Sequence, residues 1–177
     1  MNRRIILSLS AITALALTVL SNPVLAQQKS LKEQLVGSWT FVESTDTRPD
    51  GSKNNRWGPN PKGTLMFDAH GRFIQIISRS DIPKFAANNA SQGTAEENKA
   101  VLSGMIVSFG TYSVNEADKT LITHIEGGTF PNRNGSDTKR IITSLTADEF
   151  KYTNPTNSVG PAPRRIGSAL NKQSVKD

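Results

Sequence analysis

The sequence is 177 residues long, carries a formal net charge of +6 and contains no cysteine. A chain without cysteine can form neither a disulfide nor a thiolate metal site, and it has no cysteine to carry a lipid anchor. Its lysines and arginines are scattered among acidic residues, so we expect no nucleic-acid partner. The mild basic balance fits attraction of an anionic ligand or surface and fits a solvated basic surface equally well.

The N-terminus has the three regions of an export signal. Arg3 and Arg4 form a short basic region, residues 5–20 form an uncharged apolar core, and residues 24–26 precede the expected cleavage before Gln27. The apolar run is short for a membrane span and contains Ser and Thr. We therefore expect removal of residues 1–26, export to the periplasm or medium, and no membrane span in the mature chain.

The mature chain, residues 27–177, has the size of one domain. Removal of the signal leaves 177 − 26 = 151 residues and lowers the charge from +6 to +4, because two arginines leave with it. A chain of this length is typical of a single domain with one core. We expect one domain with a weakly structured tail from about residue 164.

The mature chain begins with a short helix, a strand and a loop. Ser30 and Glu33 have the spacing of a capping box, which predicts a helix that Gly37 ends. Alternating apolar side chains then predict a half-buried strand over residues 38–45. The Pro, Gly and Asn-rich segment that follows, residues 47–62, is predicted to be an irregular loop. Trp57 within it is either a lid over a cavity or an anchor packed beneath the loop.

A hairpin follows the loop. Residues 63–68 and 72–80 read as two strands joined by a tight turn. Arg79 shares a strand face with Gln75 and Ile77. Its charge therefore points into a barrel mouth or extends into water at the rim.

A second helix is predicted over residues 95–105. Thr94 and Glu97 form another capping box, and small and apolar residues recur at helical spacing after it. We expect this helix to lie against the barrel wall or to close one mouth.

The remaining pattern is again that of short strands. The candidates are residues 106–114, 120–126, 139–145, 150–153 and, more weakly, 166–170. Short antiparallel strands with turn signals at regular spacing indicate an all-β barrel or sandwich. A barrel also removes the open sheet edges that such a chain would otherwise expose.

Several short motifs run from Leu35 to about Thr153. They are LVGSW at 35–39, GPNPKGTL at 58–65, GRF at 71–73, PKFA followed by TAEENKAV, FGTYSV at 109–114, and HIEGGTFPN at 124–132 followed by Lys139 and Arg140. Together they resemble the lipocalin-like domain proteins of bacteria and fungi. The resemblance implies a lipocalin-like antiparallel β-barrel with a helix across one opening and a central pocket. The chain departs from the family after Arg164, where the expected aromatic or strongly apolar closing strand is missing.

Familiar catalytic and metal-binding signatures are absent from the sequence. There is no nucleophile elbow, phosphate loop or dinucleotide fingerprint, and the only histidines, His70 and His124, lie on different hairpins. We therefore expect no metal site and assign no cofactor. His124 and Glu126 share one strand face, and we predict that they meet Arg140 inside the barrel. This cluster either serves the barrel's own hydrogen bonding or contacts a ligand, with proton transfer as a further option.

Two functions of different classes are compatible with this pattern. The leading one is a module that binds a small apolar or amphipathic molecule in a barrel cavity. The alternative is a small isomerase or cyclase that uses the same pocket, with His124 as the proton carrier. The candidate ligand contacts are Trp57, Arg79, Tyr112, His124, Glu126, Asn132 and Arg140.

Overall fold

The structure is a computed structural model and describes residues 29–48, 50–154 and 165–172. The expected export signal lies outside these ranges. The helices are α1 (Leu31–Leu35) and α2 (Ala95–Gly104), with short 3-10 helices η1 (Ala90–Gln92) and η2 (Pro131–Arg133). The strands are β1 (Gly37–Thr47), β2 (Lys53–Asn54), β3 (Lys62–Phe67), β4 (Arg72–Ser78), β5 (Met105–Asn115), β6 (Thr120–Gly128), β7 (Asp137–Leu145), β8 (Glu149–Asn154) and β9 (Arg165–Lys172).

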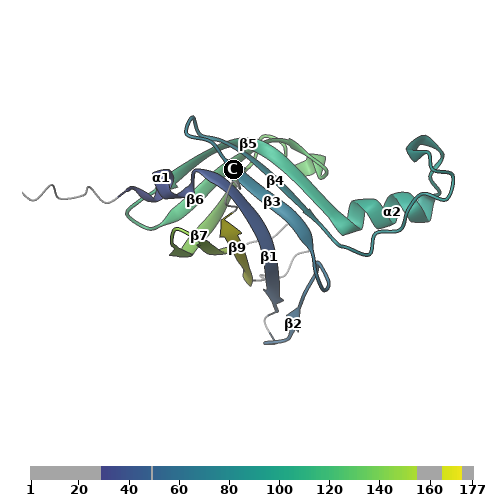
Figure 1. The fold of residues 1–177 in the computed structure, drawn as a ribbon, viewed down its shortest axis with the longest axis horizontal. Helices are drawn as coiled ribbons and strands as arrows, with labels where there is room; N and C mark the ends of the chain where they lie inside the picture. Colours follow the sequence, from purple (N-terminus) through teal and green to yellow (C-terminus); the bar gives the residue numbers. More distant parts are fainter. Residues whose placement is uncertain (1–28, 49, 155–164, 173–177) are drawn as a thin grey trace, which may run out of the picture.

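The strands form a closed antiparallel barrel, which confirms the predicted fold class (Figure 1). Eight of the nine described strands, all except β2, pair in a ring. The ring closes where β9 pairs with both β8 and β1, in a register that runs from Trp39 opposite Lys172 to Thr47 opposite Arg165. The weak C-terminal strand therefore does close the barrel, because backbone hydrogen bonds to two neighbours compensate for its modest apolar content.

The segment after β1 contains more regular structure than the sequence predicts. β1 continues to Thr47, where Asp46 lies opposite Asn54 of the short strand β2. Only two residue pairs form this ladder, so its sequence signal is hidden by the surrounding Pro and Gly residues. The prediction of a wholly irregular loop over residues 47–62 is wrong to this extent.

Helix α1 closes one end of the barrel, which we call the α1 end (Figure 1). The predicted capping box is present: the Ser30 side chain accepts from the Glu33 N–H, and the Glu33 carboxylate accepts from the Ser30 N–H. Leu35 is fully buried, and its carbonyl accepts a 2.7 Å hydrogen bond from the Trp39 indole. The helix therefore fixes the start of β1 at the α1 end of the core.

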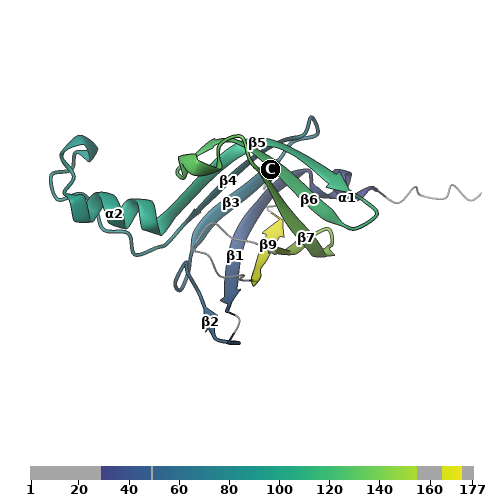
Figure 2. The same cartoon turned by 180° about the vertical axis from the view of Figure 1, so that it is seen from behind.

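Helix α2 begins at Ala95 as its capping box predicts, but it does not cover the barrel. It projects away from the strands and runs directly into β5 (Figures 1 and 2). Leu102 is 62% exposed, and the one buried residue of the helix is Gly104 beside Ile82. The expected position is wrong because its few apolar side chains are too dispersed to form a core-facing stripe. None of the described helices is long and apolar enough to cross a membrane.

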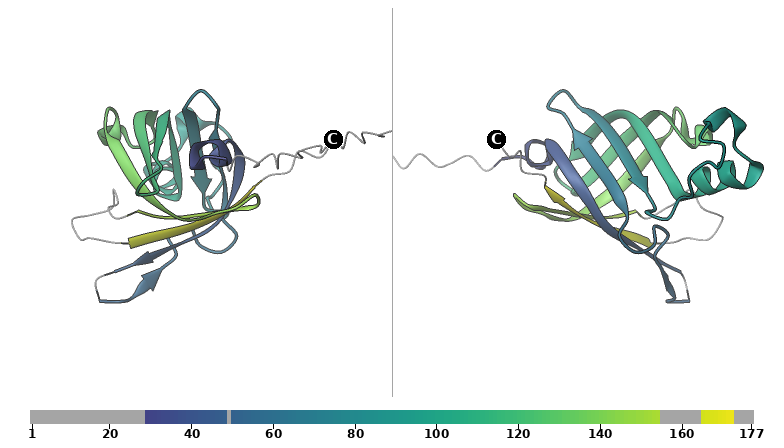
Figure 3. Two further views of the ribbon diagram at one scale, coloured as in Figure 1. Left: turned by 90° about the vertical axis from the view of Figure 1, so that its left-hand side faces the viewer. Right: turned by 45° about the vertical axis from the view of Figure 1, so that its right-hand side comes forward.

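Aromatic side chains fill the α1 end of the barrel. The rings of Trp39 and Phe150 lie 5.6 Å apart, and those of Phe67 and Tyr112 lie 5.0 Å apart. Such contacts combine a large buried apolar area with favourable edge-to-face geometry. This end is a packed core. At the opposite end of the barrel α2 runs into β5 (Figure 3), and β6 leads to η2.

Candidate functional site

Polar and charged side chains are buried inside the barrel. In the described part of the chain they are Ser44, Asp46, Gln75, Ser108, Thr123 and Arg140. They alternate with exposed residues along their strands, as inward-facing positions do. Burying a polar group costs free energy unless the group is hydrogen-bonded, so each of these side chains is expected to have a hydrogen-bond partner.

Arg140 is the centre of this polar interior. Its guanidinium donates to Gln75 Oε1 at 2.7 Å and to Thr123 Oγ1 at 3.2 Å, and it lies 5.3 Å from the centre of the Tyr152 ring. The Thr123 hydroxyl in turn lies 2.5 Å from that of Thr138. We call Gln75, Thr123, Arg140 and Tyr152 the Arg140 cluster; it joins strands β4, β6, β7 and β8 across the barrel.

The hydrogen bonding of Arg140 is incomplete. Its side chain is only 5% exposed, yet within the described ranges Nε has no hydrogen-bond acceptor. No carboxylate in those ranges forms an ion pair with it either, since the ion pairs there involve other residues. Among the described residues, the hydrogen-bond partners of the buried Arg140 cation are therefore all neutral.

A narrow pocket opens at the mouth of the barrel between β5, β6 and η2. Its lining combines apolar residues with one arginine and consists of Ile106, Val107, Ser108, Ile125, Gly128, Phe130 and Arg133. Burial, and then the nearby charge of Arg140, lower the pKa of Arg133. The two guanidiniums are therefore close enough to repel each other.

The predicted meeting of His124, Glu126 and Arg140 inside the barrel is wrong. His124 and Glu126 lie on the outer wall, with side chains 48% and 36% exposed. His124 Nδ1 lies 2.8 Å from Asp137 Oδ1, and Glu126 accepts two hydrogen bonds from Arg72 at 2.6 and 2.8 Å. Those bonds from Arg72 are the main reason why the pKa of Glu126 is lowered. Only Arg140 of the three faces inward.

The physical reason is the alternation of strand β6. The spacing of His124 and Glu126 correctly places them on one face, but Thr123 and Ile125 occupy the inward face. Within the described ranges, no three His, Asp or Glu side chains gather in a way that could hold a metal ion.

Three further candidates lie outside the Arg140 cluster. Arg79 is exposed and donates to Asp81, with Nε at 2.8 Å from Oδ1, so its charge is at the rim. Tyr112 is buried at the α1 end, where its hydroxyl donates to the Asp68 carbonyl at 2.8 Å and burial raises its pKa. Asn132 is exposed in η2. None of them contacts Arg140.

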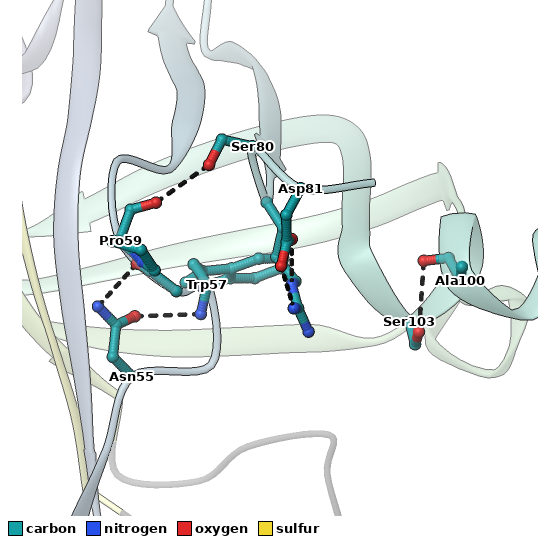
Figure 4. Close-up of polar contacts among 9 residues, drawn as sticks. Asn55, Trp57, Pro59, Ser80, Asp81, Ala100 and Ser103 are labelled. Carbon is teal, nitrogen blue, oxygen red and sulfur yellow. Dashed lines mark hydrogen bonds and ion pairs between the residues drawn. The ribbon is translucent and has the colours of Figure 1, made fainter. Parts of the chain in front are cut away.

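Trp57 packs beneath its loop and is 6% exposed. Its ring meets that of the inward-facing Phe41 edge to face at 6.5 Å, and the Arg56 guanidinium lies 4.8 Å from the ring centre. Asn55 braces the loop, since it accepts from the Trp57 N–H and donates to the Gly58 carbonyl (Figure 4). Trp57 therefore anchors the loop.

Gln75, Thr123 and Arg133 were not among the residues predicted from the sequence. Gln75 had a usable signal, because it lies two residues from both Phe73 and Ile77 and so shares the inward face of its strand with these apolar residues. Arg133 had none, since it lies in an irregular Pro, Asn and Gly-rich corner.

Comparison with known proteins bears on the fold and the family. No curated protein matches the chain. A redesigned β-barrel is similar at 16% identity and a TM-score of 0.41, over 82% of this chain and 100% of that one. A de novo designed fluorescence-activating β-barrel is similar at 11% identity and a TM-score of 0.42, over 82% of this chain and 99% of that one. A bovine odorant-binding protein in complex with a selenium-containing odorant is similar at 16% identity and a TM-score of 0.42, over 84% of this chain and 76% of that one. The family model for the lipocalin-like domain matches residues 36–165, which is most of the chain. The chain therefore belongs to the lipocalin-like domain family.

Proposed function

We propose that the protein binds a small amphipathic molecule in the half of the barrel opposite α1. The observation that carries this proposal is Arg140, a buried guanidinium inside the barrel that, within the described ranges, donates only to neutral groups and finds no acceptor for Nε. A barrel that only needed a stable core would be served as well by an apolar side chain at this position. The cluster thus supports a ligand contact rather than a purely structural role.

The mouth pocket supports the same proposal. Ser108 lines that pocket and lies opposite Gln75 in the β4–β5 register, so the pocket adjoins the Arg140 cluster. Ile106, Ile125 and Phe130 give the pocket apolar walls. Apolar walls with a few convergent polar groups are the usual composition of a small-molecule site. The pocket encloses only about 10 Å³, so its side chains must move apart to admit a ligand.

The isomerase or cyclase alternative loses its proposed acid–base pair. It needs His124 in the pocket with a carboxylate that orients it. His124 instead lies on the outer wall against Asp137, and Glu126 is bound by Arg72. The binding function is therefore the one that the geometry favours.

Fluorescence quenching tests the binding function. The chain has two tryptophans, Trp39 at the α1 end and Trp57 in the loop over Phe41. In a Trp39→Phe variant, only Trp57 remains, and neutral bromoundecanol should quench its emission saturably, because the bromine atom of a bound molecule comes close to the indole. Saturation at one molecule per chain is the expected result of a steady-state titration.

The matched variant is Trp57→Phe, in which only the deeply packed Trp39 emits. Bromoundecanol should quench this variant much less, because aromatic side chains fill the α1 end. Bromoethanol is the control for collisional quenching in solution. Linear, non-saturating quenching with the same slope for both bromo-alcohols would contradict binding in the barrel.

We also propose that the protein is exported and acts in the periplasm or medium. The support is the order of basic, apolar and small-residue regions in residues 1–26. Expression in a Gram-negative host should yield a periplasmic or secreted species that begins at Gln27, as measured by intact mass. A mature species that still contains Arg3 and Arg4 would contradict the proposal.

A further inference from the structure

The arginines of the described chain differ in how their charge is compensated. Arg72 and Arg79 lie on the outside and are ion-paired with Glu126 and Asp81. Arg140 is buried, and within the described ranges it has no such partner. Arg140 thus differs from the two outer arginines, because no carboxylate in the described ranges is ion-paired with it.

The donors of Arg140 are only partly used. A guanidinium has five N–H donors, and here one Nη group donates to Thr123, the other to Gln75, and Nε to no acceptor in the described ranges. Because Gln75 places its oxygen on Arg140, its amide NH₂ is left as a further donor in the same cluster. The cluster therefore presents donors rather than acceptors to anything that enters.

Arg133 adds a second cation on the same side. It lines the mouth pocket, and its pKa is lowered by burial and by the charge of Arg140. Two partly desolvated cations that repel each other are both stabilised by an anion placed near them. Burying an uncompensated charge lowers the stability of the fold, so an anionic ligand bound beside these arginines would stabilise the barrel.

We infer that the ligand is an amphipathic carboxylate whose headgroup binds Arg140 inside the barrel while its apolar part extends toward the mouth between β5 and β6. This inference rests on the proposed binding function and specifies its ligand class. A carboxylate suits the free Nε edge of a guanidinium, because two parallel N–H···O bonds can form there. Ile106, Ile125 and Phe130 of the mouth pocket offer apolar contacts to an alkyl or aromatic tail, for which the pocket has to widen from its volume of about 10 Å³.

The test compares decanoate with decanol, which share a chain and differ in headgroup charge. Both are titrated calorimetrically into the wild-type chain that begins at Gln27 and into Arg140→Met and Arg72→Met variants. Wild type should bind decanoate at least about tenfold more tightly than decanol, which is the effect of one charge-assisted hydrogen bond. Arg140→Met should lose that preference and keep its decanol affinity, whereas Arg72→Met, altered on the outer wall, should behave as wild type.

The outcomes separate the two proposals. Equal wild-type affinities for decanoate and decanol would overturn the carboxylate inference and leave the binding function standing, while binding of neither would count against both. Loss of the decanoate preference in Arg72→Met but not in Arg140→Met would place the anion on the outer wall and overturn the site.

If Arg140→Met does not fold, the wild-type preference for decanoate is measured near neutral pH and below about pH 4, where carboxylates become protonated. A preference that persists at low pH would overturn the inference.

Discussion

Replacement of Trp39 by alanine should lower the free energy of unfolding by about 3–5 kcal/mol, as large-to-small changes at fully buried aromatic positions do. Trp39 is completely buried, its ring lies 5.6 Å from that of Phe150, and its indole donates to the Leu35 carbonyl. Alanine removes these contacts at the junction of α1 and β1 and leaves a cavity. The loss should be visible as a lower urea midpoint in circular dichroism.

A Trp39→Phe variant is the graded control. Phenylalanine retains most of the aromatic packing but loses the hydrogen bond to the Leu35 carbonyl, so its midpoint should lie between those of alanine and wild type. Midpoints for Trp39→Ala and wild type that agree within error would show that α1 does not close the barrel as described.

Replacement of Gly110 by alanine should destabilise the barrel by about 3 kcal/mol or more, at the upper end of overpacking effects. Gly110 lies where the β5–β6 register shifts. A Cβ atom there would lie only 2.0 Å from the carbonyl oxygen of His124 and 3.0 Å from the backbone nitrogen of Glu126. Both contacts are to backbone, so the two strands must separate to accommodate the methyl group.

Gly127→Ala is the matched control on the same pair of strands. Its added Cβ would meet the ring of Phe109 at 2.7 Å, and Phe109 is partly exposed, so the ring can rotate away. Its urea midpoint should fall by clearly less than that of Gly110→Ala. Equal losses in the two variants would contradict a rigid bulge at Gly110.

The fold was predictable because its determinants are local. Period-two alternation and turn residues identify most strands, and each capping box identifies the start of a helix. The closure by β9 depends on strand pairing with β1 across the barrel seam, which no short window of sequence contains. The outward direction of α2 follows from its direct junction with β5 at Gly104 and Met105 and from its lack of a core-facing apolar stripe.

The candidate site was predictable only in part. Arg140 was correctly expected inside the barrel, but its partners were not, because a shared face does not say which face is inward. In the run from Leu121 to Glu126, apolar side chains fall on both faces, so alternation alone leaves the choice open. The register of β6 against β7, with Leu121 opposite Arg140, decides it.

The most direct test of an interior ligand site is the NMR resonance of the Arg140 side-chain Nε–Hε group in the chain that begins at Gln27. Assignment by comparison with the Arg140→Met variant identifies the signal. Titration with decanoate should shift this resonance saturably together with the backbone amides of Gln75, Thr123 and Ser108, because these residues surround the proposed headgroup. An unchanged Arg140 resonance, with shifts confined to outer-wall residues such as Arg72 and His124, would contradict a ligand site inside the barrel.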